Sequence, residues 1–167
     1  TIDQLHSHGV ADVRLWARGV DSTRFDPSHR SEEWRARMSP AGKKIVGFVG
    51  RLAVEKQVED LVRLGNIPNV QLVIVGEGPQ RARLQQLLPD AVFTGFLGGA
   101  ALAQAVASFD VMVSPGEFET FCQTIQEAMA SAVPVVAPAR GGPLDLVDHS
   151  RTCLLYTSDA ADDSLRV

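Results

Sequence analysis

From residue 44 onward, short apolar runs alternate with segments in which apolar residues recur every three or four positions. The runs are rich in β-branched residues and are bounded by Gly or Pro, and they cover residues 45–49, 70–75, 91–94, 110–113 and 133–137. Consecutive apolar residues are typical of strands that are buried on both faces. Strands that alternate with helices are joined by right-handed crossovers. The alternation therefore predicts an α/β fold, a Rossmann-like open parallel sheet with helices on both faces.

Four segments between these runs have the apolar spacing of helices. Their apolar residues are Val58, Leu61 and Val62; Leu84, Leu87 and Leu88; Leu102, Val106 and Phe109; and Phe121, Ile125 and Met129. The first forty residues contain no independent core: residues 12–16 suggest a strand, residues 19–21 a turn, and residues 31–38 a short helix with Ser31 as its N-cap. We expect this region to connect into the sheet domain.

Composition favours a globular protein and argues against several functional classes. Of the 167 residues, 45% are hydrophobic and 22% are charged, which allows a sizeable core. Because the chain has no apolar run of eighteen residues and lacks the layout of a secretory signal, we expect it to be cytoplasmic. The net charge of -4 argues against nucleic-acid binding. Cys122 and Cys153 are too few for a disulfide scaffold and form no C-x-x-C pair.

The turn after the first predicted strand carries two cations. Arg51 lies in the turn that begins at Gly50, and Lys56 precedes the next helical segment. Ligands of open parallel sheets bind at the carboxyl ends of the strands. Two cations beside the free N–H groups of a helix N-terminus form a pocket for a diphosphate. The alternative is that both residues are solvated surface cations.

The turn after the second predicted strand contains Gly76 and Gly78. Arg81 stands where a dinucleotide-binding fingerprint has its third glycine, so that motif is incomplete. We interpret the segment as a tight turn before a helix that Pro79 initiates.

The turn after the fourth predicted strand carries two carboxylates. Glu119 lies just before the predicted helix, and Glu127 lies on it, away from the predicted buried face. An ionised carboxylate accepts hydrogen bonds from two hydroxyl groups, so this pair could bind vicinal hydroxyl groups of a ligand. Alternatively, Glu119 caps the helix and Glu127 is solvated. Cys122 has no His near it in the sequence, and we interpret it as a small residue at the helix start, not as a nucleophile.

Taken in order, these turns resemble the C-terminal donor-binding domain of retaining glycosyltransferases of family 4, which have the two-domain GT-B fold. The matching motifs are Gly-Arg-Leu-x-x-Glu-Lys at residues 50–56, Val-x-Val-Gly-x-Gly-Pro at residues 73–79, and Glu-Thr-Phe-x5-Glu-Ala-Met-Ala at residues 119–130. The resemblance implies a truncated C-terminal half of a GT-B fold. Residues 1–40 would be the interdomain connection and first strand, and residues 41–152 an incomplete nucleotide-sugar donor-binding domain.

The same resemblance implies roles for individual residues. The expected catalytic residues are Arg51 and Lys56, which would bind the diphosphate, and Glu119, which would hold hydroxyl groups of the donor sugar. The other expected donor-binding residues are Gly50 in the first turn, Phe96 and Leu97 near the base, Phe121, Cys122, Gln123 and Thr124 around the sugar and phosphate, and Glu127 at the ribose. No metal and no cofactor are expected besides the nucleotide-sugar donor.

Residues 119–131 and 134–147 are most similar to bacterial GDP-mannose-dependent α-mannosyltransferases. This similarity implies that the full protein transfers mannose from GDP-mannose, with retention, to a lipid or glycan acceptor held by another domain, and that it works at the inner face of the membrane. This piece alone would be inactive. Cys122 and Ala132 depart from the family, because most members have Gly at both positions. A UDP-sugar-dependent transferase and a non-catalytic Rossmann-type nucleotide-binding module remain alternatives.

The last residues break the pattern of the chain before them. Residues 153–163 resemble a translated sequencing adapter, and Cys153 stands where the family usually has Gly. We therefore expect natural sequence to end near Thr152 and residues 153–167 to be a non-natural tail; the codons of this stretch would decide the question. A sheet interrupted there has an unpaired edge, so we expect the isolated chain to be marginally stable or prone to aggregation.

Overall fold

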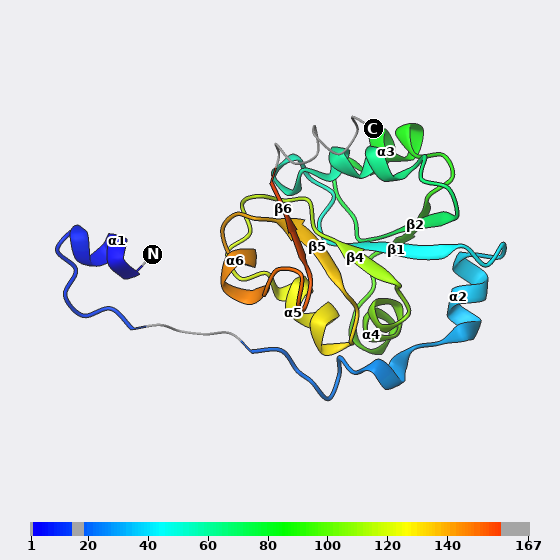
Figure 1. Cartoon of the computed structure of the whole chain (residues 1–167). Coiled ribbons are helices and arrows are strands. Elements are labelled where there is room, and N and C mark those ends of the chain that lie inside the picture. The colour runs from blue at the N-terminus through cyan, green and yellow to red at the C-terminus, as the bar shows by residue number, and fades with distance from the viewer. Residues whose placement is uncertain (1, 15–18, 158–167) are drawn as a thin grey trace.

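A computed structural model describes residues 2–14 and 19–157, and it contains a six-stranded parallel sheet (Figure 1). The strands are β1 (Lys44–Val49), β2 (Val70–Val75), β3 (Val92–Gly95), β4 (Val111–Val113), β5 (Val135–Pro138) and β6 (Leu154–Tyr156). Their order in the sheet is β3-β2-β1-β4-β5-β6, and every neighbouring pair is parallel. This order is that of a Rossmann fold. The predicted fold class is confirmed.

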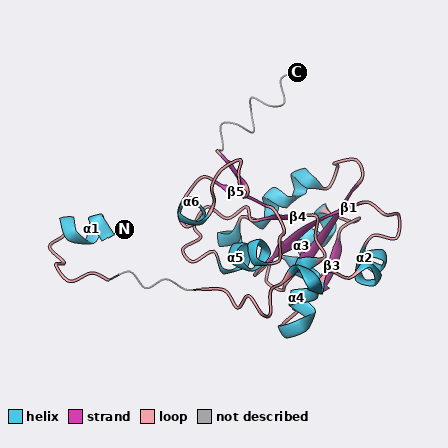
Figure 2. Ribbon diagram, turned by 60° about the horizontal axis from the view of Figure 1, so that its bottom comes forward, coloured by secondary structure: helices cyan, strands magenta, loops and turns pink. Residues whose placement is uncertain are grey.

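Helices lie on both faces of the sheet (Figures 1 and 2). The α-helices are α1 (Ile2–Ser7), α2 (Glu32–Met38), α3 (Arg81–Leu87), α4 (Gly99–Ala107), α5 (Gln123–Ala130) and α6 (Pro143–Leu146), and the 3-10 helices are η1 (Pro27–His29), η2 (Val54–Lys56) and η3 (Val58–Leu64). In Figure 1, α3 is above the sheet, and α4 and α5 are below it. Helix α3 packs with η3, and α4 packs with α5. Helix α1 stands apart from the sheet in both views.

Two apolar cores fill the space between the sheet and its two layers of helices. Along β2, Val73 and Val75 belong to the core shared with α4 and α5. Leu72 and Ile74 belong to the core shared with η3 and α3. Successive side chains of a strand point to opposite faces, so burial of both faces requires the consecutive apolar residues seen in the sequence.

Five predicted strands match the observed ones to within two residues at each end, but two helical predictions need correction. Residues 58–64 form a 3-10 helix and not an α-helix. Phe121 lies outside α5 and is 54% exposed, so Ile125 and Ala128 form the buried face of that helix. The cause is the left-handed backbone of the residue after Phe121, which delays the start of the helix until residue 123.

Helix α2 fastens the segment before β1 to the sheet. It begins after Ser31, as predicted, and the Ser31 hydroxyl accepts a hydrogen bond from the Trp34 N–H (3.1 Å). The Asp110 carboxylate accepts hydrogen bonds from Arg35 (3.0 Å) and from the Ile45 N–H at the start of β1 (2.7 Å). Burial opposes ionisation of Asp110, but these two hydrogen bonds, the charge of Arg35 and a hydrogen bond from Arg30 together outweigh it and hold the pKa of Asp110 below its usual value.

Upstream of this anchor, the strand expected at residues 12–16 is not observed in the part that the structure describes. Residues 12–14 have no regular structure, and the last two residues of the expected strand lie outside the described residues. The predicted turn lies three residues further along the chain. There the Asp21 carboxylate accepts hydrogen bonds from the N–H groups of Thr23 (3.1 Å) and Arg24 (3.0 Å), which stabilises the turn.

The predicted non-natural tail, residues 153–167, contains the sixth strand. β6 pairs with β5, and Leu154 is in register with Val136. The preceding Cys153 is buried, and its Sγ accepts a hydrogen bond from the Val135 N–H (3.3 Å). Residues 158–167 lie outside the described part of the chain. The non-natural origin of residues 153–167 stays a prediction.

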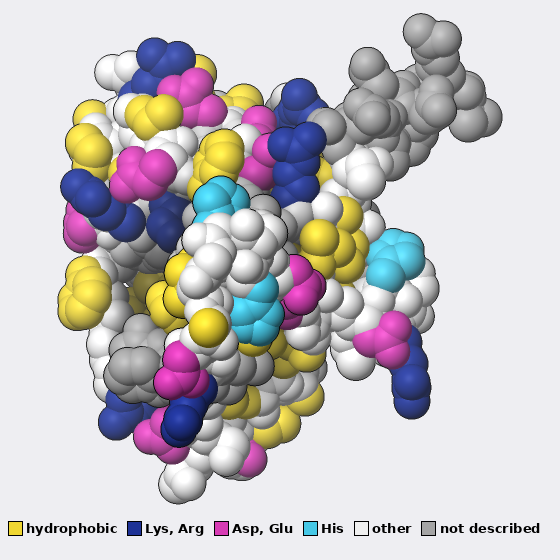
Figure 3. All heavy atoms as spheres, turned by 90° about the vertical axis from the view of Figure 1, so that its left-hand side faces the viewer, with side chains coloured by type: hydrophobic (Ala, Val, Ile, Leu, Met, Phe, Trp, Pro, Cys, Tyr) yellow, Lys and Arg dark blue, Asp and Glu magenta, His cyan; other side chains and the backbone are white. Residues whose placement is uncertain are grey.

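Basic and acidic side chains are interspersed on the face shown in Figure 3. Within residues 2–14 and 19–157, no helix combines the length and the apolar character that crossing a membrane requires. The same residues contain no cluster of three or more His, Cys, Asp or Glu side chains arranged to hold a metal ion.

Candidate active site

The candidate site lies between the carboxyl ends of β1 and β4. These strands are neighbours in the sheet, and the strand order runs in opposite directions on their two sides. Ligands of open α/β sheets bind in the crevice at such a switch point. A cavity of about 190 Å³ lies there, lined by Phe48, Val49, Gly50, Arg51, Lys56, Ser114, Gly116, Glu119, Gln123 and Thr124. The structure thus brings the predicted residues of the first and fourth turns together in one cavity.

Two glycines of the turn after β2 hold the loop after β1 in place. A Cβ atom at Gly76 would overlap the carbonyl oxygen of Gly50, and one at Gly78 would overlap that of Leu52. These glycines therefore permit close contact between two backbones. Helix α3 begins two residues after Pro79, so the prediction that Pro79 initiates it is wrong.

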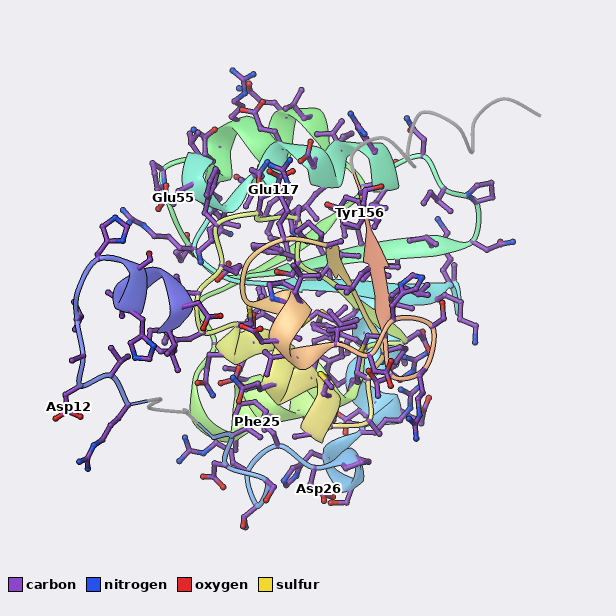
Figure 4. The ribbon with its side chains drawn as sticks, turned by 60° about the vertical axis from the view of Figure 1, so that its left-hand side comes forward. Asp12, Phe25, Asp26, Glu55, Glu117 and Tyr156 are labelled. Carbon is purple, nitrogen blue, oxygen red and sulfur yellow. The ribbon has the colours of Figure 1, made fainter. Side chains whose placement is uncertain are left out.

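Lys56 and Glu119 meet in the cavity. Lys56 ends the 3-10 helix η2, and its Nζ donates a hydrogen bond to Oε1 of Glu119 (2.6 Å). Their side chains are 33% and 19% exposed, so solvent screens this ion pair only in part. The Arg51 side chain is 67% exposed and pairs with Glu55 (3.4 Å), which is labelled in Figure 4. The alternative of a solvated surface cation therefore describes Arg51 better than Lys56.

The loop that carries Glu119 packs against the turn after β5. The Gly142 N–H donates a hydrogen bond to the Glu119 carbonyl oxygen (2.8 Å), and a Cβ atom at Gly142 would lie only 2.9 Å from that oxygen. Arg140 pairs with the Glu117 carboxylate (2.9 Å). On the other side, Gln57 accepts a hydrogen bond from the Glu117 N–H (2.6 Å). Sequence reasoning missed Gln57, Glu117 and Arg140, because their partners are more than twenty residues away and no motif marks them.

Two departures from the family pattern fall at unusual backbone positions. Cys122 has φ 49° and Ala132 has φ 56°, which is the left-handed region that favours glycine. The glycines that most family members have there are therefore explained by the backbone. Cys122 is buried, and burial, reinforced by the charge of Glu119, raises the pKa of its thiol to about 11. A thiol that stays protonated near neutral pH is no nucleophile, which agrees with the structural role expected for it.

Helix α5 presents its first residues to the cavity. Gln123 and Thr124 line it, whereas Glu127, one turn further along, does not. Burial raises the pKa of Glu127, and the Gln123 side chain and Arg24 offset this only in part. Glu127 is therefore half-buried and not solvated, in contrast to the alternative stated above.

The remaining predicted residues lie outside the cavity lining. Phe96 follows β3 and is 79% exposed, whereas the neighbouring Leu97 packs partly into the core. Phe121 is exposed, and its carbonyl oxygen accepts a hydrogen bond from the Gln126 side chain (2.8 Å). Cys122 contributes only its backbone to the start of α5. The site thus has a cationic and carboxylate centre, and Phe96 is an exposed aromatic side chain at the end of β3, two strands away from β1 in the sheet.

The comparison with known proteins decides the family. Residues 43–165 match the family described as Glycosyl transferases group 1, which is well over half of the chain. The chain belongs to this family. Among the relatives of this group 1 glycosyl transferase, the GDP-mannose-dependent alpha-mannosyltransferase of Corynebacterium glutamicum is 56% identical over 156 residues. The enzyme of the same name from Mycolicibacterium smegmatis is 57% identical over 164 residues. They cover 93% and 98% of this chain.

Solved structures agree with the fold. Anabaena HepE, crystallised in complex with UDP and glucose, superposes with a TM-score of 0.72 at 27% sequence identity. The match covers 84% of this chain and 42% of HepE. The parallel sheet is therefore that of a GT-B glycosyltransferase. The chain spans only 38% and 44% of the length of the two mannosyltransferases.

Proposed function

We propose that the full-length protein is a retaining α-mannosyltransferase and that this chain binds its donor, GDP-mannose. The observation that carries the proposal is the meeting of Lys56 with Glu119 at the switch point of the sheet, where the Nζ and Oε1 atoms are 2.6 Å apart. A cation and a carboxylate at one strand end suit a ligand with a phosphate at one end and hydroxyl groups at the other. The two GDP-mannose-dependent relatives support the choice of base and sugar.

The mechanism follows from where charge develops. When the bond between the sugar and the diphosphate breaks, negative charge grows on the leaving diphosphate. Lys56 and Arg51 stabilise that charge together with the N–H groups at the start of α5, so they bind the transition state more strongly than the substrate. These groups supply the electrostatic stabilisation that a divalent cation gives in other transferases. We therefore propose that transfer needs no metal.

Glu119 and Glu127 hold hydroxyl groups in this proposal. When the diphosphate engages Lys56, the Glu119 carboxylate gains sugar hydroxyls as hydrogen-bond donors. Glu127 takes the ribose hydroxyls. Burial disfavours its charged form and raises its pKa, so a hydrogen bond donated by a hydroxyl group would stabilise the ionised carboxylate. Backbone groups of Gly50, Phe121 and Cys122 complete the phosphate and sugar contacts.

The base lies beyond β3 in this proposal. The exposed ring of Phe96 offers a flat apolar surface to a nucleobase, and Leu97 supports it from the core side. The acceptor is a lipid or glycan bound by the rest of the protein. We propose that the full-length protein is cytoplasmic and reaches such an acceptor at the inner face of the membrane.

Titration of the full-length protein with GDP-mannose, UDP-glucose and NAD tests the assignment. GDP-mannose is expected to bind most tightly and to support transfer of mannose. Preference for UDP-glucose would remove the mannosyl assignment while keeping a glycosyltransferase, in line with the UDP complex of HepE. Binding of NAD alone would leave a Rossmann-type nucleotide-binding module instead.

A further inference from the structure

Gln57 has a backbone conformation that is unusual for its residue type. It lies between the 3-10 helices η2 and η3, next to Lys56, with φ 50° and ψ 36°. A side chain with a Cβ atom is strained in this left-handed region. Such strain persists only where the surrounding contacts hold it, and it is concentrated at functional sites.

The Gln57 side chain joins the two loops that form the site. Its Oε1 accepts a hydrogen bond from the backbone N–H of Glu117 (2.6 Å). Glu117 lies two residues before Glu119, the partner of Lys56. One bond thus links the residue after Lys56 to the loop that carries Glu119, beside the ion pair and across the same gap between β1 and β4.

The aromatic side chains of the loop that carries Glu119 do not pack into the core. Phe118 is 80% exposed and Phe121 is 54% exposed, so neither aromatic ring fixes the loop in the core. A hollow of about 400 Å³ lies beside it, lined in part by Gln57, Glu117 and Tyr156. The loop therefore depends on polar contacts for its position, and the bond to Gln57 ties the loop backbone to the β1 side.

We propose that Gln57 is a positioning residue of the donor site: by accepting the Glu117 N–H, it holds the Glu119 carboxylate within reach of Lys56. This inference rests on the proposed function, because it assigns the site to donor binding. Gln57 itself need not touch the donor. Without the bond, the loop samples positions in which Glu119 and Lys56 do not face one ligand together. Apparent donor affinity falls in proportion to the fraction of molecules that keep the competent arrangement.

Three substitutions in the full-length protein separate the bond from the backbone strain. Gln57→Met keeps the length of the side chain but has no strong acceptor. Gln57→Gly adopts the left-handed backbone freely but also lacks the acceptor. Gln57→Glu keeps an acceptor oxygen. The matched control is Gln71→Met, which removes the hydrogen bond from the Gln71 side chain to the Asp90 carbonyl oxygen (2.8 Å), away from the site.

The first readout is hydrogen exchange of the Glu117 amide without any donor present. We expect faster exchange in Gln57→Met and Gln57→Gly, and wild-type exchange in Gln57→Glu and Gln71→Met. The second readout is donor kinetics. Gln57→Met and Gln57→Gly are expected to raise KM for GDP-mannose about two- to tenfold, the range of one net hydrogen bond, with kcat at saturating donor unchanged.

Opposite results would overturn the inference. Wild-type exchange and KM in Gln57→Met would show that the bond does not hold the loop. A Gln57→Gly protein that matches wild type would mean that the backbone conformation matters and the acceptor does not. A loss of kcat alone, with wild-type KM and wild-type exchange of the Glu117 amide, would also overturn it, because the loop would then keep its position without the bond. If the wild-type protein fails to bind GDP-mannose, the proposed function fails, while the exchange data still report on Gln57.

Discussion

At the scale of single residues, the sequence predicts which motif residues line the site, but not which side chains these residues contact. Arg51, Lys56 and Glu119 stand in short motifs at strand ends, so topology alone predicts that they converge, and the cavity lining confirms this. The pairing of Lys56 with Glu119 across 63 positions depends on side-chain directions that no spacing rule gives. Gln57 was missed for a related reason, because its left-handed backbone leaves no trace in the residue type.

Replacing Lys56 tests the role of the cation. In the full-length protein, Lys56→Ala should lower kcat roughly ten- to a thousandfold, because one group that stabilises developing charge is lost. Lys43→Ala removes an exposed lysine before β1 and serves as the control. Steady-state kinetics with GDP-mannose measure both. Kinetics of Lys56→Ala equal to those of the control would reject the assignment.

At the scale of elements, apolar runs predicted strands well and helices less well. A strand buried on both faces leaves a continuous run of apolar residues, as β2 does. The late start of α5 follows from the left-handed backbone of Cys122, and neither this start nor the 3-10 geometry of η3 can be read from the period of apolar residues. The attachment of α2 to the sheet was also unpredicted, because it depends on long-range polar contacts with Asp110.

The Asp110 contacts predict a pH-dependent contribution to stability. Asp110→Asn leaves the donors of Arg35 and Ile45 poorly paired and should cost about 1.5–3 kcal/mol at pH 7. The folded-state pKa of Asp110 is lowered, so its contribution is complete above the unfolded value of about 4 and is lost as pH falls through the folded value. We expect the melting temperature of wild type to exceed that of Asp110→Asn at pH 7, and this difference to disappear only as the pH falls towards 3. An equally large loss of melting temperature in the control Asp145→Asn, which changes an exposed carboxylate, would contradict this.

The close contact between the turns after β1 and β2 predicts that substitution of Gly76 costs more stability than substitution of Gly42. Gly42 and Gly76 both have positive φ, 67° and 137°, but open space surrounds Gly42, whereas a Cβ atom at Gly76 would overlap the Gly50 carbonyl oxygen. Gly42→Ala should cost about 1–2 kcal/mol from the backbone alone. Gly76→Ala should cost about 1–3 kcal/mol more, because the neighbouring loop must move. Denaturant unfolding measures the difference, and equal losses would show that the loop yields freely.

At the scale of the whole molecule, the parallel order was expected from the alternation of strands and helices, but the order of the strands was not. Several doubly wound orders satisfy the same alternation. The observed order leaves β3 and β6 at the edges of the sheet among the described strands. β6 has three residues, and Leu154 on it is 51% exposed. An exposed apolar side chain on an edge strand favours pairing with another chain, and the short length of β6 limits the extent of that pairing.

The isolated 167-residue chain is therefore expected to melt at low temperature and to aggregate. Leu154→Lys should reduce aggregation, because a charge on an edge strand opposes pairing with a second sheet. Leu144→Lys changes a leucine of similar exposure on helix α6 and not on the edge strand, and should have little effect. Light scattering during thermal unfolding measures the aggregation of wild type and of the two variants. A cooperative melt at high temperature without aggregation would contradict the expectation.

The pairing of β1 with β4 is recorded over only two residue pairs, Val46 with Val111 and Gly47 with Met112, although β1 continues to Val49. Beyond those pairs β1 and β4 are no longer paired, and the cavity lies between the segments that follow. Its existence thus depends on where backbone pairing stops, while its chemistry depends on loop side chains such as Glu119. Because Phe96 is exposed on the loop after β3 and is not part of the core, we expect that substitutions there leave the packing of the domain intact and, if the proposed base contact is right, change nucleotide preference.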